Sequence, residues 1–121
     1  MWVERMSEHN QQVFYFAMAK LKAVSDKRWE SIFAVPNAFK RTPRQGKWMK
    51  DEGLKAGVPD IMVAVPSSGY HGLFIELKVK GGRVSASQKG WLERLNEQGY
   101  KAVVCYGGEE ALEVTEEYFN G

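Results

Sequence analysis

The stretch that decides the fold runs from Gly57 to Gly82 and has the sequence GVPDIMVAVPSSGYHGLFIELKVKGG. Two apolar segments, DIMVAV and LFIELKVK, flank the turn-forming residues PSSGYHG, so the stretch predicts a β-hairpin. The first segment is apolar on both faces, which is typical of a central strand. The second alternates, and places Glu76 and Lys78 on one face and Leu77 on the other. Charged side chains within such strands are the first indication of a functional site.

The segments before this hairpin predict a helix, a strand and a short helix. Ser7 is a suitable N-cap for a helix that continues to about Val24. Its apolar stripe is broad, which indicates that the helix packs on a sheet. The residues WESIFAV before Pro36 are typical of a strand. A shorter helix is expected over residues 47–54, after a basic segment that contains two prolines.

The segments after the hairpin predict a helix, a strand and a last helix. Residues 85–88, SASQ, match a capping box, and Gly99 is a suitable left-handed end for the helix that starts there. The apolar segment KAVVCY predicts a strand, and an acidic helix follows to about Phe119. A crossover through the first of these helices should place KAVVCY parallel to the strand that carries Glu76. The predicted order is α-β-(α)-β-β-α-β-α, a mixed sheet with helices on both faces.

The composition is that of an ordinary globular domain. The chain has 121 residues, of which 44% are hydrophobic and 26% are charged, so we expect a single domain over residues 1–121. No apolar segment approaches the roughly 20 residues that span a bilayer. The N-terminal residues lack the apolar core of a signal peptide, so we expect a cytoplasmic location and no membrane association. A single cysteine, Cys105, excludes an intramolecular disulfide framework.

Charge is unevenly distributed, although the net charge is only +2. Residues 37–57 contain six basic and two acidic residues, whereas residues 109–117 contain five glutamates and no basic residue. The first segment would attract a polyanion such as DNA, and the second would repel it. A solvated loop and a solvated helix face are the alternative, and Trp48 could equally stack on a base or pack internally. The candidates for phosphate contacts are Lys40, Arg41, Arg44, Lys47 and Lys50.

Strand pairing brings the charged residues of the hairpin together. If Val65 pairs with Leu73, Asp60 lies opposite Lys78, and Asp60 and Glu76 become diagonal neighbours on one face of the sheet. A slip of one residue would separate them. Two carboxylates about 4 Å apart repel each other by an energy on the order of 4 kcal/mol. The repulsion is relieved if one carboxylate takes up a proton or if a cation binds between them.

A divalent cation would give these residues a chemical role. Mg²⁺ binds one or two carboxylates together with waters and phosphate oxygens, and it lowers the pKa of bound water. Lys78 could then position or deprotonate the attacking water, or stabilise developing charge. Gln88, on the buried face of its predicted helix, could contact the metal site or a substrate phosphate. The alternatives are an ion pair of Lys78 on a solvated strand face and a purely capping role for Gln88. Glu8 and Gln12 have the spacing of a surface pair.

The combined motif resembles the VRR-NUC family of nucleases, within the PD-(D/E)xK superfamily. It comprises GVPD at residues 57–60, ELK beginning at Glu76, GGRVSASQ and WLERLNEQGYKAVVC. The resemblance extends from SEHNQQ to the final helix. The chain resembles the compact single-domain members of the family, of viral and bacterial type. It implies an α/β fold that is restriction-endonuclease-like, with a mixed central sheet flanked by helices.

The resemblance also implies site residues, a cofactor and a substrate. The cofactor would be Mg²⁺ or Mn²⁺, and the reaction would be endonucleolytic hydrolysis of structured DNA, with branched substrates such as Holliday junctions, in DNA repair or recombination. It further implies a homodimer, and the host cytoplasm as location if the chain is viral. A DNA-structure-binding module without catalysis, and a flap nuclease or exonuclease on the same fold, are the alternatives. The implied catalytic residues are Asp60, Glu76, Lys78 and Gln88, and the implied metal ligands are Glu8, Asp60, Glu76 and the carbonyl of Leu77.

Overall fold

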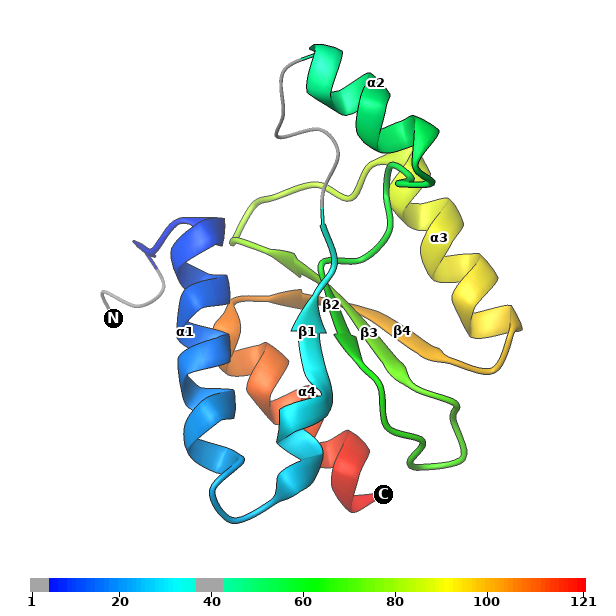
Figure 1. Cartoon of the computed structure of the whole chain (residues 1–121). Helices are drawn as coiled ribbons and strands as arrows, with labels where there is room; N and C mark the ends of the chain where they lie inside the picture. Colours follow the sequence, from blue (N-terminus) through cyan, green and yellow to red (C-terminus); the bar gives the residue numbers. More distant parts are fainter. Residues whose placement is uncertain (1–4, 37–42) are drawn as a thin grey trace.

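A four-stranded mixed sheet forms the centre of the protein, in a computed structural model that describes residues 5–36 and 43–121 (Figure 1). The strand order is β1-β2-β3-β4. β2 is antiparallel to both β1 and β3, whereas β3 and β4 are parallel. The predicted hairpin and the parallel last strand are therefore confirmed. The strands comprise Ile32–Ala34, Ile61–Val63, Leu73–Lys78 and Lys101–Tyr106.

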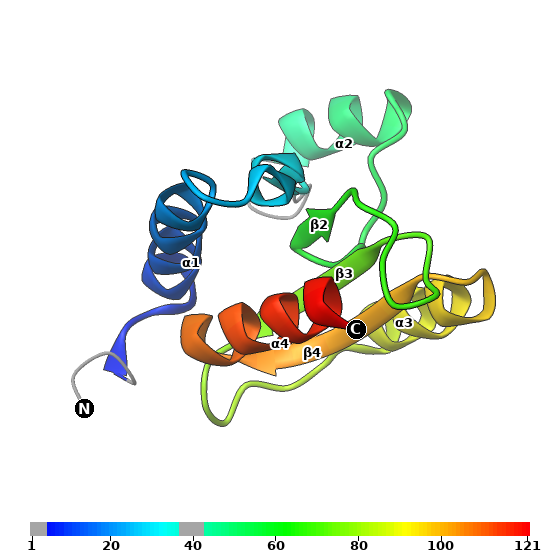
Figure 2. The same ribbon diagram turned by 90° about the horizontal axis from the view of Figure 1, so that it is seen from below.

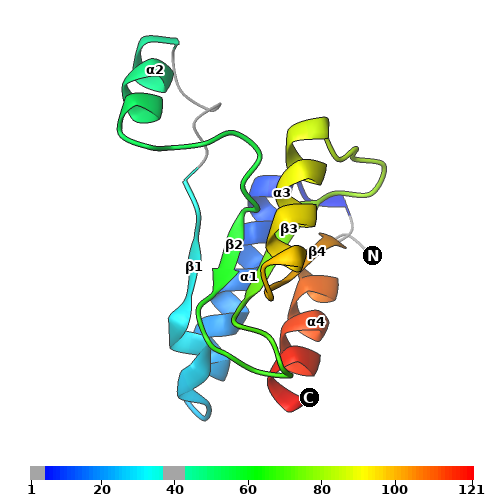
Figure 3. The same cartoon turned by 90° about the vertical axis from the view of Figure 1, so that its right-hand side faces the viewer.

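Helices cover both faces of this sheet (Figures 2 and 3). One face packs against α1 (Glu8–Lys22) and α4 (Gly108–Asn120), and the other packs against α3 (Ala86–Glu97). The alternation along β3 explains this arrangement, because Ile75 joins the apolar cluster beneath α1 and α4 whereas Phe74 joins the cluster beneath α3. Within the described ranges, no helix has the length and apolar character needed to cross a bilayer.

The segment between α1 and β1 differs from the prediction. Residues Lys27–Ser31 form a 3-10 helix, η2, so the predicted strand is reduced to three residues. The Asp26 carboxylate caps η2 by accepting a hydrogen bond from a backbone N–H two residues further on, at 3.1 Å. The Trp29 ring packs edge-on against Phe119 of α4, with 5.3 Å between ring centroids. A local cap and a tertiary contact therefore override the β-propensity of this segment.

The short helix α2 (Pro43–Asp51) begins at Pro43 instead of residue 47. Proline is favoured at the first helical position because the N–H that it lacks would have no partner there. α2 projects beyond the end of the sheet at which β2 begins and β3 ends (Figures 1 and 3). Lys40 and Arg41 lie outside the described residues. The other predicted phosphate contacts, all exposed on α2, are Arg44, Lys47 and Lys50.

The hairpin register is shifted by two residues from the predicted one. Val63, and not Val65, lies opposite Leu73. The chain leaves the ladder after Val63 and closes through a bridge between Ser67 and Tyr70, and the two residues inside this turn have positive φ. Positive φ at both central positions is typical of two-residue hairpin turns. A shift of two residues keeps every side chain on its predicted face, whereas a shift of one would not.

Candidate functional site

The two carboxylates of the predicted site meet across the hairpin. Continuing the register of β2 and β3 by one residue places Asp60 opposite Glu76, and not opposite Lys78 as predicted. Asp60 lies immediately before β2, and its Oδ2 accepts a hydrogen bond from the backbone N–H of Leu77 at 2.8 Å. This bond holds Asp60 against the strand that carries Glu76, so the two halves of the hairpin form one site.

Glu76 is the buried centre of this site. Its exposed fraction is 1%. Its Oε2 accepts a hydrogen bond from Gln88 Nε2 at 3.2 Å and lies 3.6 Å from Lys78 Nζ. Its Oε1 is buried and has no hydrogen-bond partner among the described residues. A buried carboxylate oxygen without a partner is costly unless a proton or a cation satisfies it.

The surroundings of Glu76 favour its protonated form. Burial contributes most, followed by the negative charge of Asp60, and together they raise the pKa of Glu76 to about 8. The ammonium group of Lys78 acts in the opposite direction, and the charge of Glu8 adds to the rise. Without a cation, Glu76 therefore holds a proton at neutral pH. A metal ion that binds there has to displace this proton, so metal affinity should rise with pH.

The backbone of β3 offers a third oxygen beside the two carboxylates. The carbonyl of Lys78 accepts a hydrogen bond from Gly107 N–H, on the β4 side, at 2.9 Å. Successive carbonyls of a strand point to opposite edges, so the Leu77 carbonyl faces the side of β2. The next ladder position there is Pro59, which has no N–H to donate. Two carboxylates and this carbonyl are the hard oxygen donors that suit Mg²⁺ and Mn²⁺.

These donors fit a divalent metal ion that keeps several waters. In the ranges 5–36 and 43–121, no three His, Cys, Asp or Glu side chains gather into a metal-binding cluster. Mg²⁺ commonly binds through one or two carboxylates and completes its sphere with water and substrate phosphate. Glu8 is close enough for its charge to act on Glu76, but it does not complete a three-carboxylate cluster. Its role as a ligand stays a prediction.

Gln88 forms the predicted capping box and also contacts Glu76, and its role toward a metal ion or a substrate phosphate stays a prediction. At the start of α3, Ser85 Oγ accepts a hydrogen bond from the Gln88 backbone N–H at 3.2 Å, and Gln88 Oε1 accepts one from the Ser85 N–H at 2.8 Å. The Nε2 of the same amide donates to Glu76. The capping box therefore fixes the orientation of the amide that holds one oxygen of Glu76.

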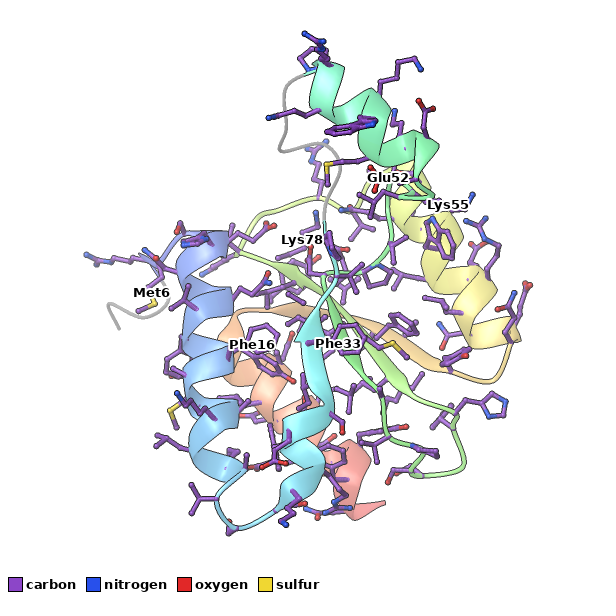
Figure 4. The ribbon with its side chains drawn as sticks, viewed as in Figure 1. Met6, Phe16, Phe33, Glu52, Lys55 and Lys78 are labelled. Atoms are coloured by element: carbon purple, nitrogen blue, oxygen red, sulfur yellow. The ribbon has the colours of Figure 1, made fainter. Side chains whose placement is uncertain are left out.

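Lys78 ends β3 at the edge of the site. Its side chain is 12% exposed, and its ammonium group lies 3.6 Å from the Glu76 carboxylate. Figure 4 shows Lys78 at the end of the sheet nearest the segment that follows α2, which carries Glu52 and Lys55. A largely buried ammonium group in this position can contact both the carboxylate and a molecule that enters from solvent.

Gln11 is a buried polar residue that the sequence analysis missed. Its side chain is 3% exposed, and its Oε1 accepts a hydrogen bond from Gly108 N–H at the start of α4, at 2.8 Å. The signal was its spacing from the buried residues Tyr15 and Ala19, since the three lie one helical turn apart on the inner face of α1. Gln11 ties α1 to α4 and so fixes the face of the sheet opposite the site.

Gly57 allows the segment that carries Asp60 to approach the start of α3. Its φ is +87°, and a Cβ atom there would lie 2.7 Å from the backbone carbon of Ser87 and 2.8 Å from its carbonyl oxygen. Only glycine combines this conformation with so close an approach. Gly57 therefore lets the segment that leads to Asp60 lie close to the start of α3, where Gln88 is located.

Replacing Gly57 by Ala is expected to weaken the metal response of the protein. The new Cβ must push the Asp60 segment away from α3. Gly53→Ala is the control, because Gly53 also has a positive φ but a Cβ there would have no atom within 4 Å. Gly53→Ala should lose roughly 1 kcal/mol of stability, and Gly57→Ala should lose more, because its Cβ also clashes with the backbone of Ser87. Only Gly57→Ala should reduce the rise in Tm on addition of Mg²⁺. Equal metal responses in the two variants would show that the contact with Ser87 does not position the site.

The sequence and the fold match one family. A family model described as the VRR-NUC domain matches residues 5–109. A solved structure described as a VRR_NUC domain protein superposes with a TM-score of 0.80 and 26% sequence identity, covering 95% of this chain and 89% of that chain. No curated protein matches the chain significantly. Because the matched range spans most of the chain and includes Asp60, Glu76, Lys78 and Gln88, the chain belongs to the VRR-NUC domain family, a family of nucleases.

Proposed function

We propose that the protein is a metal-dependent endonuclease that hydrolyses phosphodiester bonds in structured DNA, with branched molecules such as Holliday junctions as substrates. The observation that carries the proposal is the convergence of Asp60, Lys78 and Gln88 on Glu76, which has a buried oxygen without a partner in the described ranges. A structural ion pair would not need a second carboxylate directly opposite. Membership of a nuclease family supports the same chemistry.

Each residue of the site has a separate task in this proposal. Mg²⁺ or Mn²⁺, held by Asp60, Glu76 and the Leu77 carbonyl, would supply a Lewis acid and a water of lowered pKa. The Leu77 N–H orients Asp60, and the Gln88 amide orients Glu76. The Lys78 ammonium group, on a side chain that is 12% exposed, orients the attacking water or stabilises the charge that develops on the phosphate.

DNA binding is assigned to the basic residues on and before α2. Arg44, Lys47 and Lys50 project from a helix that lies beyond the site end of the sheet (Figure 1), and Lys40 and Arg41 precede them in the sequence. Such residues contact phosphates with little sequence readout. Each contact that is removed should lower the slope of log affinity against log salt concentration by about 1.

A homodimer is part of the proposal because a four-way junction has two-fold symmetry. Two copies related by a two-fold axis would present two sites to two strands. Exposed apolar side chains on α1, in the turn that follows it and on β1 provide surface that a second copy could cover: Val13, Leu21, Val24 and Phe33. The mass in solution, measured with and without junction DNA, tests this part separately.

Incubation with synthetic DNA tests the proposal as a whole. The substrates are a four-way junction, a flap, a nicked duplex and an intact duplex, each with Mg²⁺, Mn²⁺ or EDTA. We expect internal cleavage of the junction with either metal and none with EDTA. Binding without metal-dependent product on any substrate would favour the DNA-binding module instead. Product only from flaps or free ends would favour the flap nuclease or exonuclease.

A further inference from the structure

Trp48 is the most exposed of the described aromatic side chains. Its exposed fraction is 70%, against 48% for both Phe33 and Tyr106. A packing role inside the protein is therefore excluded in this structure. A tryptophan ring offers a large apolar area, and leaving it in water is unfavourable unless another molecule covers it.

The ring lies on the outward face of α2, within a shallow groove. Arg44, Trp48 and Asp51 follow the i, i+4, i+7 spacing and share this face, whereas Gly46, on the opposite face, is buried. The groove has a volume of about 490 Å³. The residues that line it are Arg44, Gln45, Lys47, Trp48 and Asp51.

The charge of α2 favours an anionic partner. The helix carries three basic residues and one acidic residue, Asp51. Lys47 forms an ion pair with Asp51 at 3.0 Å, and Arg44 has no acidic partner among the described residues. A two-fold contact of α2 with itself would bring like charges together. A polyanion that also presents flat apolar rings satisfies both the charges and Trp48.

Nucleic acid has this chemistry, and only some of its bases are accessible. In an uninterrupted duplex each base face is covered by its neighbours, whereas an unpaired base at a branch, flap or gap exposes a face for stacking. α2 lies beyond the end of the sheet that holds Asp60 and Lys78 (Figures 3 and 4). We propose that Trp48 stacks on an unpaired base of DNA while Arg44 and Lys47 contact the adjacent phosphates. This inference rests on the proposed function for one point only, that the ligand is DNA.

A double-mutant cycle between protein and DNA tests this stacking. Binding is measured in EDTA by fluorescence anisotropy with an intact duplex, a duplex with a short single-stranded flap, and the same flap with abasic residues next to the branch. Trp48→Ala should bind the normal flap about 10-fold more weakly. It should bind the intact duplex like wild type and lose nothing further on the abasic flap. Trp48→Phe should retain most of the affinity.

Two control variants separate stacking from other causes. Arg44→Ala should weaken binding to all three DNAs, because phosphates are common to them. Tyr70→Ala, which removes an exposed aromatic ring from the hairpin turn at residues 67–70, should leave all three affinities unchanged. Circular dichroism confirms that each variant is folded.

Four results would overturn the stacking inference. The first is normal binding of the flap by Trp48→Ala. The others are an equal loss on the intact duplex, an undiminished effect of Trp48→Ala on the abasic flap, and a change of solution mass in Trp48→Ala that marks the ring as a protein interface. Because no cleavage is measured, the two proposals fail separately. If the wild type cuts DNA and Trp48→Ala binds the flap normally, only the stacking inference is disproved. If Trp48→Ala shows the expected binding pattern but the wild type never cuts DNA, only the nuclease proposal is disproved.

Discussion

Replacement of Asp60 by Asn is expected to abolish metal-dependent cleavage and, at the same time, to stabilise the metal-free protein. Asn retains an oxygen that can accept the hydrogen bond from Leu77 N–H, so the hairpin should keep its geometry. It removes the negative charge that faces Glu76, which is one of the causes of the raised pKa of Glu76. If Asp60 holds the proposed metal ion, its replacement should lower the cleavage rate by more than about 100-fold.

The stabilising effect should depend on pH in a defined direction. The pKa of Glu76 is about 8 in the folded protein and is close to 4.5 in an unfolded chain. Between these values the folded state binds more protons, so the metal-free wild type loses stability as pH rises from about 5 to 8. Asp60→Asn should lessen this loss, by an amount on the order of 1 kcal/mol at pH 8.

Urea unfolding in EDTA at pH 5 and pH 8, together with the Tm in the presence of Mg²⁺, provides the measurement. Wild type should gain stability from Mg²⁺ at pH 8, whereas Asp60→Asn should gain little. Asp51→Asn is the matched control, since it makes the same chemical change at an exposed carboxylate on α2 and should behave like wild type. A fully active Asp60→Asn enzyme, or one that is less stable than wild type at pH 8, would contradict the assignment of the site.

The elements predicted best from the sequence are those whose signals are local. The capping box at Ser85 and Gln88 marks the start of α3, and the left-handed Gly99 marks its end. Each signal lies within a few residues of the helix end that it marks. The hairpin was also predicted, and its faces were correct, because alternation along β3 is a property of one strand. Its register was not, because the turn at residues 67–70 depends on backbone conformations that alternation does not specify.

The features that escaped prediction depend on contacts between remote segments. The η2 helix is stabilised by packing of Trp29 on Phe119, and Gln11 caps the start of α4 almost a hundred residues later in the chain. The sequence around Trp29 and Gln11 does not indicate that their partners lie in α4. The meeting of Asp60, Glu76 and Lys78 could be predicted because all three lie within one hairpin. They share a face of the sheet both in the predicted pairing of Val65 with Leu73 and in the observed pairing of Val63 with Leu73. The direct opposition of Asp60 and Glu76 strengthens the predicted repulsion, since a facing pair lies closer than a diagonal one.

Replacement of Lys78 by Met is expected to remove cleavage even at high pH and saturating Mg²⁺, where metal binding is retained, and to leave DNA binding in place. Met keeps much of the length and apolar stem of Lys78 but has no charge, so packing at the end of β3 should be preserved. If Lys78 orients the attacking water or stabilises developing charge, kcat should fall by about 10²–10⁴-fold. The fall should persist at saturating Mg²⁺ and pH 9, where Glu76 is deprotonated more readily.

The same conditions distinguish this role from a merely electrostatic one. The charge of Lys78 lowers the pKa of Glu76, so its removal also weakens metal binding at neutral pH through competition with a proton. If Lys78 acted only in this way, high pH and excess metal would restore the rate of Lys78→Met. Lys80→Met is the control, because Lys80 lies two residues later in the chain and is exposed, and it should cut like wild type. Recovery of full cleavage by Lys78→Met would limit Lys78 to holding Glu76 in its charged form, and a rate that stays low would place its ammonium group in contact with the reacting phosphate or water.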